Sequence, residues 1–454
     1  MSAQALSAAQ AKMRAAGVNE TAVAIFSDYH RQLGHGSTGL IPESDIEPVS
    51  GLDRLDDLPE SADDRDALAQ TAVIRLNGGL GTSMGLSAAK SLLPVRDRLS
   101  FLDLIARQVL RARERYRVRL PLVLLHSFNT RDDSLAALAG YDLQVGDLPL
   151  DMMQSQEPKL LVDDLSPVSW PADPRLEWCP PGHGDIYPTL LESGLLDALL
   201  GEGFRYACVA NADNLGAAPS ARLAGWFARC GAAFAAEVTP RTPMDIKGGH
   251  LARRRSDGRL VLRESAQTPP EDRRFFTDPA VHPYASTNNL WFDLGELRRT
   301  LSERDGVLGL ALIRNQKTVD PRDPGTPAVY QVESAMGAAI ECFDRATAIV
   351  VPRSRFVPVK STNELLLLRS DTYRIDDDWV PRAEVSPLPV VSLSGAYRRL
   401  DDYQARLPQA PSLRQARSLT VQGDWSFGRE VVVEGDVVLG PEGGSVPDRA
   451  VLKG

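Results

Sequence analysis

Residues 72–91, AVIRLNGGLGTSMGLSAAKS, decide the fold of this chain. Ala72–Leu76 is a short, mostly apolar run that predicts a buried strand, and a turn with four glycines follows it directly. Such glycines let the backbone bend sharply and approach a ligand, and the successive N–H groups of the turn form a cradle for an anion. Lys90, near the end of the stretch, can place an ammonium on a phosphate.

The turn is neither of the two common nucleotide-binding loops. The Gly-Lys-Ser/Thr end of a Walker A motif is missing because Lys90 follows Ala89, and the glycine spacing differs from the dinucleotide fingerprint. Without its neighbours, the stretch is equally compatible with a tight surface turn. The rest of the chain decides between that simpler interpretation and a phosphate loop.

Further apolar runs alternate with helical stretches and predict the other strands of the same sheet. These runs are Leu120–His126, Tyr206–Ala210, Ala232–Val238 and Ala348–Val351. Leu102–Tyr116 is predicted as a helix that Ser100 and Asp103 open with a capping box, and Leu190–Leu200 as a helix that Gly201 closes. This alternation indicates a mostly parallel sheet flanked by helices, with ligands at the carboxyl ends of the strands.

The chain divides into three parts by pattern. Residues 1–45 predict an N-terminal helical segment with helices at Ala5–Gly17 and Glu20–Leu33, because alanine-rich and amphipathic stretches favour helices. Residues 46–372 contain the α/β pattern and are expected to form the catalytic domain. Residues 373–454 are expected to form a separate C-terminal domain.

The C-terminal domain has a short internal repeat. Val421, Phe427, Val433 and Leu439 recur at intervals of six residues. A six-residue rhythm is typical of a β-helix, in which each turn stacks on the last, and we expect a left-handed one here. Two hairpins with similar turns are the alternative.

Composition excludes several classes of protein. The 454 residues carry a net charge of −9, and an acidic chain repels a nucleic-acid backbone, so no nucleic-acid partner is expected. No apolar stretch approaches the roughly 18 residues of a membrane span, and the N-terminus lacks the order of a signal peptide. The four scattered cysteines form no C-x-x-C pair, so we expect reduced thiols and a cytoplasmic protein.

The glycine turn has a wider context. Residues 76–85 with Lys90 resemble the signature of the eukaryotic-type UTP–glucose-1-phosphate uridylyltransferases, and the resemblance continues in ordered blocks over most of the chain. These blocks are Ser127–Thr130, Gln154-Ser155 with Pro158, Pro180–Tyr187, Asn211–Gly216, Lys247–Gly249, Thr287–Trp291 and Val351–Lys360. The resemblance implies the nucleotidyltransferase version of the α/β fold and favours the phosphate loop over the surface turn.

The resemblance also implies roles for individual residues. The nucleotide would be lined by Leu76, Asn77, Gly78, Gly79, Lys90, Gln154, Gly182, Asp213 and Lys360. Lys90 and Lys360 would be the catalytic cations at the reacting phosphates. Gln154 would read uracil, since a side-chain amide offers both a donor and an acceptor.

The same resemblance implies a sugar-phosphate set and a metal ligand. The set consists of Gly79, His183, Asn211, Lys247, Asn288, Asn289 and Glu333. Asp213 follows the strand Tyr206–Ala210 and would hold Mg²⁺, which prefers one or two carboxylates with phosphate oxygens and water. A helix cap is the simpler role for such an aspartate. The family often reads Cys-Lys-Gly-Pro-Lys where residues 86–90 read LSAAK, so one lysine is absent.

The implied reaction joins UTP to a hexose 1-phosphate, α-D-glucose 1-phosphate by family default, through in-line attack on the α-phosphorus with release of pyrophosphate. A monomer or small homo-oligomer is expected. Two alternatives stay open: a UDP-N-acetylhexosamine or other UDP-sugar pyrophosphorylase, and an inactive sugar-nucleotide sensor. Residues 82–85, TSMG, favour the glucose enzyme, and retention of Lys90, Asp213 and Lys360 disfavours the sensor.

Overall fold

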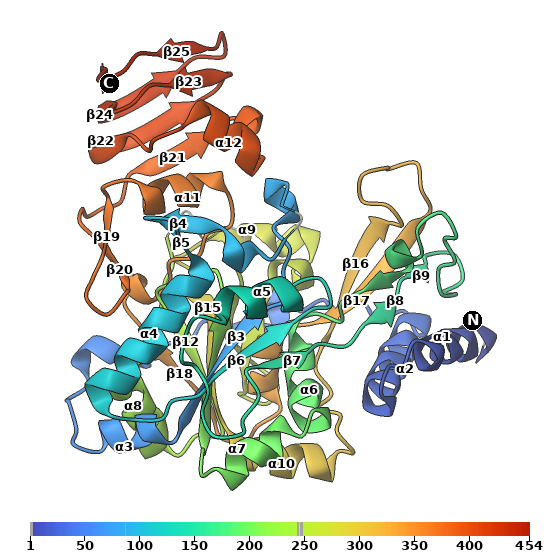
Figure 1. The fold of residues 1–454 in the computed structure, drawn as a ribbon. Helices are drawn as coiled ribbons and strands as arrows, with labels where there is room; N and C mark the ends of the chain where they lie inside the picture. Colours follow the sequence, from blue (N-terminus) through green and yellow to red (C-terminus); the bar gives the residue numbers. More distant parts are fainter. Residues whose placement is uncertain (1–2, 87, 243–244, 246–247) are drawn as a thin grey trace.

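The computed structural model describes residues 3–86, 88–242, 245 and 248–454. Within them, a sheet of 11 strands occupies the middle of the molecule, with helices on both faces (Figure 1). Its main path runs through β2 (Asp53–Arg54), β18 (Ala346–Val350), β12 (Phe234–Pro240), β15 (Tyr284–Asp293), β11 (Tyr206–Asn211), β3 (Thr71–Asn77), β6 (Leu122–His126) and β7 (Asp151–Met153).

The sheet is mixed and mostly parallel, as the sequence predicted. β11, β3, β6 and β7 pair in parallel, as do β12, β18 and β2, whereas β15 runs antiparallel between β11 and β12. A branch of the same sheet contains β1 (Ile46–Glu47), β13 (His250–Arg254) and β14 (Leu260–Arg263). Separate two-stranded ladders pair β4 (Pro94–Arg96) with β5 (Leu99–Ser100), β8 (Glu157–Pro158) with β10 (Trp178–Cys179), and β19 (Tyr373–Ile375) with β20 (Pro381–Ala383). A three-stranded ladder contains β9 (Leu160–Leu161), β17 (Ala328–Ser334) and β16 (Leu312–Thr318).

Two hydrophobic cores cover the two faces of the central sheet. Val73 of β3 belongs to the core packed with α4 and α8, whereas its neighbours Ala72 and Ile74 belong to the core packed with α6, α7 and α10. Because successive side chains of a strand point to opposite faces, a strand covered on both sides is mostly apolar along its length. The flanking helices are α3 (Asp64–Ala69), α4 (Phe101–Tyr116), α5 (Arg131–Leu138), α6 (Ile186–Glu192), α7 (Leu195–Gly201), α8 (Ala221–Cys230), α9 (Arg273–Thr277) and α10 (Leu294–Glu303).

One helix prediction is confirmed and one is corrected. Ser100 Oγ accepts from the Asp103 N–H at 3.1 Å and the Asp103 carboxylate accepts from the Ser100 N–H at 2.9 Å, which is the predicted capping box of α4. The single helix predicted over Leu190–Leu200 is wrong, because α6 ends at Glu192 and α7 begins at Leu195. Gly194 between them has φ +73°, a left-handed conformation that interrupts a helix.

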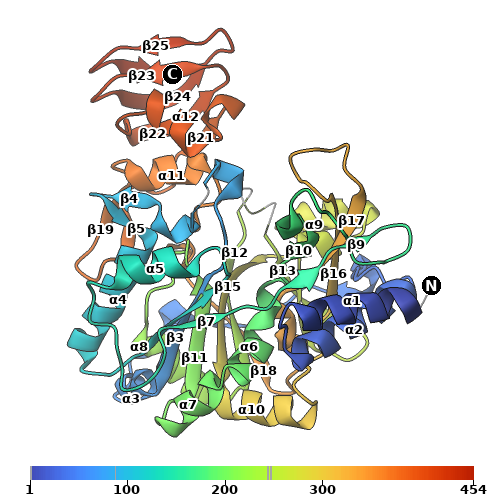
Figure 2. The same ribbon diagram turned by 45° about the vertical axis from the view of Figure 1, so that its right-hand side comes forward.

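The N-terminal helices form where the sequence placed them. α1 (Ala3–Ala15) and α2 (Glu20–Gly34) share a small core with β9, β16 and β17, and they lie beside that small sheet in Figures 1 and 2. Over the described residues, no helix combines the length and the apolar character needed to cross a bilayer.

The C-terminal strands stack above the α/β body on α11 (Thr362–Arg369), and α12 (Leu400–Arg406) lies beside them (Figures 1 and 2). They are β21 (Val390–Leu393), β22 (Ser412–Val421), β23 (Trp425–Phe427), β24 (Val432–Leu439), β25 (Gly444–Val446) and β26 (Val451–Lys453). Their ladders are parallel, and each pairs residues 18 to 28 positions apart, such as Val421 with Leu439. Hairpins pair strands antiparallel, so the hairpin alternative is wrong.

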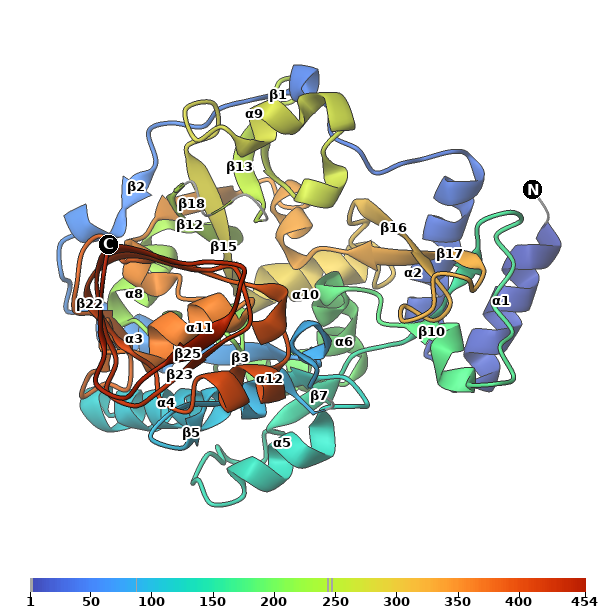
Figure 3. The same ribbon diagram turned by 90° about the horizontal axis from the view of Figure 1, so that it is seen from above.

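The six-residue rhythm marks the interior of this stack of strands. Val421, Phe427 and Val433 are almost fully buried, and Leu439 packs against the same core. That core is continuous with the one formed by α4 and α8. Figure 3, which looks down on the stacked strands, shows successive turns of chain superimposed on one another.

Candidate active site

The carboxyl ends of β3 and β11 meet at one edge of the sheet, and a cavity of about 370 Å³ lies among the loops that leave them. This volume is in the range of small-molecule sites. The lining includes Leu76, Asn77, Gly78, Gly79, Lys90, Gln154, Gly182, His183, Asn211 and Asp213, all of which the sequence predicted as site residues. The tertiary fold therefore brings four separate sequence blocks to one place.

Gln154 lies directly against Gly78. A Cβ at residue 78 would come 3.0 Å from Gln154 Nε2 and 3.2 Å from its Oε1, so the amide fills space that a larger residue would occupy. The Gln154 N–H donates to the His126 carbonyl at 2.8 Å, and Ser127 Oγ donates to the Gly78 carbonyl at 2.8 Å. These bonds fix the loops after β3, β6 and β7 to one another and hold the amide at the cavity.

Lys90 and Asp213 form an ion pair within the cavity lining. Lys90 Nζ donates to Asp213 Oδ2 at 2.6 Å and also to the Val359 carbonyl, and both charged side chains are 18% exposed. The Lys90 N–H donates to the Gly79 carbonyl at 3.2 Å, so the glycine turn closes on itself before the lysine leaves it. The predicted phosphate cation and the predicted metal ligand are thus immediate neighbours.

His183 is neutral at physiological pH. Its Nδ1 accepts from the Met336 N–H at 2.9 Å, and burial lowers the pKa of the imidazole to about 4. Because Nδ1 is occupied as an acceptor, Nε2 carries the hydrogen and can only donate. Gly182, just before it, has φ +82°, and a Cβ there would lie 2.5 Å from the Ser334 carbonyl oxygen. His183 is therefore arranged as a hydrogen-bond donor and lacks a free lone pair for a general base.

The two predicted sugar-binding asparagines point in different directions. The β12–β15 ladder pairs Glu237 with Asn289 and then Val238 with Ser286, which leaves two residues of β15 outside it. Asn288 is one of them, with φ +57°, and its Nδ2 donates to Asn211 Oδ1 at 3.0 Å beside the cavity. Asn289 instead turns into the protein and is 2% exposed. The irregularity in the ladder therefore separates a residue at the site from one that supports it.

Glu333 and Lys360, two further predicted residues, lie near the cavity but outside its lining. Glu333 on β17 is beside the cavity loop, with its Cβ 3.1 Å from where a Cβ of Gly182 would be, and burial raises the pKa of its carboxyl. Lys360 is exposed and directly follows Val359, whose N–H donates to the Asp213 carbonyl at 3.3 Å. Neither residue is part of the cavity lining itself. Lys247 lies outside the described residues.

The donor set fits a magnesium ion whose other ligands are phosphate oxygens and water. In the described part of the chain, no three His, Cys, Asp or Glu side chains gather as a complete metal cage. Mg²⁺ needs only one or two carboxylates when phosphate oxygens and water supply the other ligands, and Asp213 provides one beside the glycine turn. Lys90 bonds to only one oxygen of that carboxylate.

Two supporting residues escaped the sequence analysis. Glu237 on β12 is 1% exposed, and Arg355 bonds to both of its carboxylate oxygens, at 2.6 and 2.9 Å. A signal was present, since Glu237 is the single charged residue in the apolar run Ala232–Val238. A buried charge needs a partner, so the run itself indicated one elsewhere in the chain.

The fold and the cavity define an α/β protein with a glycine-rich phosphate loop, cations and a carboxylate at the carboxyl edge of its sheet. The family model described as UTP–glucose-1-phosphate uridylyltransferase matches residues 23–434. The chain belongs to this family.

Individual relatives agree over most of the chain. It is 39% identical over 414 residues to the UTP–glucose-1-phosphate uridylyltransferase of Pyrus pyrifolia, covering 90% of this chain and 85% of the relative. It is 36% identical over 392 residues to that of Saccharomyces cerevisiae, covering 85% and 77%. Among solved structures, a mutant UDP-glucose pyrophosphorylase of Leishmania major in complex with UDP-glucose is 41% identical, covers 100% of this chain and 99% of that one, and superimposes with a TM-score of 0.93.

Proposed function

We propose that this chain transfers the uridylyl group of UTP to α-D-glucose 1-phosphate, giving UDP-glucose and pyrophosphate. The observation that carries the proposal is the cavity itself, in which the glycine turn, the Gln154 amide and the Lys90–Asp213 pair surround one space. Family membership and the likeness to a structure solved with UDP-glucose support the same substrate pair.

The proposed chemistry is a direct displacement. A phosphate oxygen of the sugar 1-phosphate attacks the α-phosphorus of UTP, the bond to the β-phosphate breaks, and pyrophosphate leaves. The attacking phosphate is already anionic, so no general base is needed, which agrees with a His183 that can only donate. The protein's contribution is then positioning and neutralisation of charge.

Each charged residue has a distinct part in this scheme. Lys90 and Lys360 offset the negative charge on the α-phosphoryl group and the leaving pyrophosphate. Asp213 would hold Mg²⁺, and when bound the ion would neutralise part of the phosphate charge. His183 and Asn288 would donate hydrogen bonds to the sugar phosphate, while Gln154 presents its amide to the uracil edge.

The experiment is pyrophosphate release with Mg²⁺, crossing UTP, TTP, ATP and GTP with the 1-phosphates of glucose, galactose and N-acetylglucosamine. Turnover confined to UTP with glucose 1-phosphate is the expected result. Preferential turnover of N-acetylglucosamine 1-phosphate would overturn the sugar assignment. Protein that binds UDP-glucose but releases no pyrophosphate in any combination would overturn the enzymatic role and favour a sensor.

We also propose that residues 373–454 form a left-handed β-helix, that residues 1–45 and 46–372 are the other two domains, and that the chain acts as a monomer or small homo-oligomer in the cytoplasm. The parallel ladders and the buried six-residue rhythm support the β-helix. Four free thiols support a reducing compartment. Light scattering of the purified chain tests the assembly, and a large oligomer would contradict it.

A further inference from the structure

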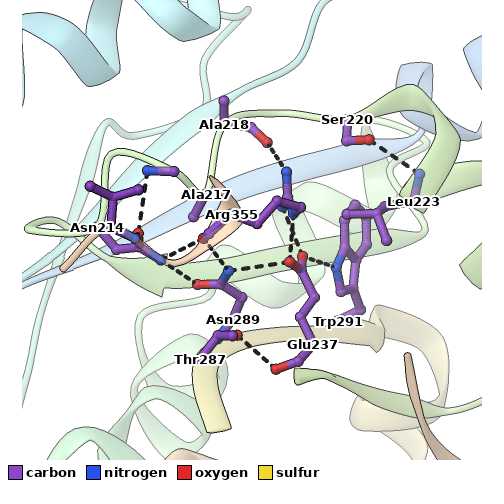
Figure 4. A network of polar contacts seen from close by, with 12 residues as sticks. Asn214, Ala217, Ala218, Ser220, Leu223, Glu237, Thr287, Asn289, Trp291 and Arg355 are labelled. Atoms are coloured by element: carbon purple, nitrogen blue, oxygen red, sulfur yellow. Dashed lines mark hydrogen bonds and ion pairs between the residues drawn. The ribbon is translucent and has the colours of Figure 1, made fainter. Parts of the chain in front are cut away.

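Glu237 is a buried carboxylate with every hydrogen-bonding position occupied by protein. Arg355 binds it through Nε at 2.6 Å and Nη2 at 2.9 Å, the indole N–H of Trp291 donates to it at 2.9 Å, and Asn289 Nδ2 donates at 3.2 Å (Figure 4). Burial alone would raise the pKa of Glu237, but Arg355 and the two hydrogen-bond donors lower it below its ordinary value. The carboxylate is therefore charged, satisfied and shielded from water.

The network continues from Glu237 towards the cavity through two asparagines. Asn289 Oδ1 accepts from Asn214 Nδ2 at 3.0 Å, and the same Nδ2 donates to the Arg355 carbonyl at 3.1 Å. Asn214 Oδ1 accepts from the Val357 N–H at 2.9 Å. Figure 4 shows Asn214, Asn289, Arg355 and Glu237 in one continuous chain of contacts.

This network joins two loop segments that carry proposed catalytic groups. Asn214 follows Asp213 in the loop after β11, and it forms an isolated bridge with Pro358, two residues before Lys360. A Cβ at Gly216 would lie 2.5 Å from the Ser354 carbonyl oxygen, so the two backbones are in direct contact. The relative position of Asp213 and Lys360 thus depends on contacts that run through Asn214 and Arg355.

Stability alone is a poor explanation for such a pair. A buried ion pair pays a desolvation cost that its attraction often only balances, and apolar residues of similar volume can replace one without loss of stability. A fully satisfied polar network does something that apolar packing does not, because its directional bonds allow a single arrangement. The geometry of the two loops is the property that these bonds determine.

We propose that Glu237 and Arg355, acting through Asn289 and Asn214, are positioning residues that set Asp213 against Lys360 for the uridylyl transfer. This inference rests on the proposed function. None of these four side chains lines the cavity, so they act on the reaction only through the loops they hold.

The test compares Glu237→Gln with Asp64→Asn. Glu237→Gln keeps the side-chain volume but loses the ion pair, and we expect kcat to fall about 10- to 100-fold, the range that a displacement of about 1 Å produces. Titration calorimetry should show UDP-glucose affinity within about threefold of wild type, because the substituted side chain is not part of the cavity lining. The half-saturating Mg²⁺ concentration should rise as Asp213 shifts. Asp64, paired with Arg229 at 2.6 Å on α3 and α8, serves as a control carboxylate–arginine pair away from both loops, and its variant should lose stability but keep kcat.

A double variant distinguishes loss of loop positioning from the cost of leaving one buried charge without its partner. Glu237→Leu with Arg355→Met removes both charges together and leaves neither unpaired, so it is expected to fold even where Glu237→Gln does not. Its kcat should stay at least tenfold below wild type. Wild-type kcat in either folded Glu237 variant would overturn the positioning role. An inactive wild type would instead overturn the proposed function, so the two failures are distinguishable.

Discussion

Gly78→Ala tests whether Gln154 reads the base. The new Cβ would lie 3.0 Å from Gln154 Nε2, 3.2 Å from Oε1 and 3.3 Å from Cδ, so the amide must withdraw by a few tenths of an ångström. The half-buried end of a long side chain can move at little cost in stability, but its hydrogen bonds to a ligand are lost or bent. One such bond is worth about 1–1.5 kcal/mol, which predicts a roughly tenfold higher KM for UTP. Because a base contact is the same in the ground and transition states, kcat should stay within about threefold.

Steady-state kinetics of Gly78→Ala, Gln154→Ala and the double variant provide the assay. If the glycine acts only by leaving room for the amide, the double variant should raise the KM for UTP no further than Gln154→Ala alone. If the two substitutions instead act independently, so that the double variant has a KM for UTP about 100-fold above wild type, this reasoning is refuted. Gly79→Ala is the control for stability, since a Cβ there meets no protein atom within 4 Å.

Three further predictions concern the charged groups of the site. Asp213→Asn should lower kcat at least ~10³-fold and flatten the Mg²⁺ response, and a normal metal titration would remove this ligand from the scheme. Lys360→Met should lower kcat by about 10²–10³-fold while the Kd for UTP, measured by calorimetry, stays within threefold; unchanged turnover would exclude a catalytic role. The half-buried His183, with a folded-state pKa of about 4, stays neutral while the unfolded chain takes up a proton below pH ~6.5. Its stabilisation is therefore complete above pH ~6.5 and is lost by roughly 3 kcal/mol as pH falls to 4. Urea unfolding should show the wild type losing this advantage over His183→Gln in that interval, and parallel pH profiles would contradict the assignment.

The sheet was predictable because its signals are local. The five apolar runs became β3, β6, β11, β12 and β18, since strands buried on both faces are apolar at nearly every position. The capping box of α4 needs only Ser100 and Asp103, three positions apart. The break between α6 and α7 was missed because the helical pattern of apolar residues continues past Gly194. A glycine predicts the end of a helix only when that pattern also stops, and here the pattern resumes at Leu195.

Part of the site could also be predicted from the sequence, and part of it could not. The lining residues lie in blocks whose order and composition can be read along the chain, and ten of the predicted residues surround one cavity. The different directions of the Asn288 and Asn289 side chains could not be predicted from the sequence, because they depend on two residues of β15 that are not paired in its ladder with β12. The pairing of Glu237 with Arg355 could not be predicted either, because the two residues are 118 positions apart in the chain.

By itself, then, the sequence determined five strands of the central sheet, three of the four helices predicted from it, the phosphate loop and ten of the residues that line the cavity. The strands, the helices and the phosphate loop follow from periodicity and glycine geometry, which act over a few neighbouring residues, whereas the lining residues were implied by the resemblance of ordered sequence blocks to a known family. Only the tertiary structure decided that Lys90 pairs with Asp213, that His183 can donate but not accept, and that a buried ion pair joins the two catalytic loops. Those properties depend on which surfaces meet when distant segments pack, and on the loss of water around charges that no local pattern records.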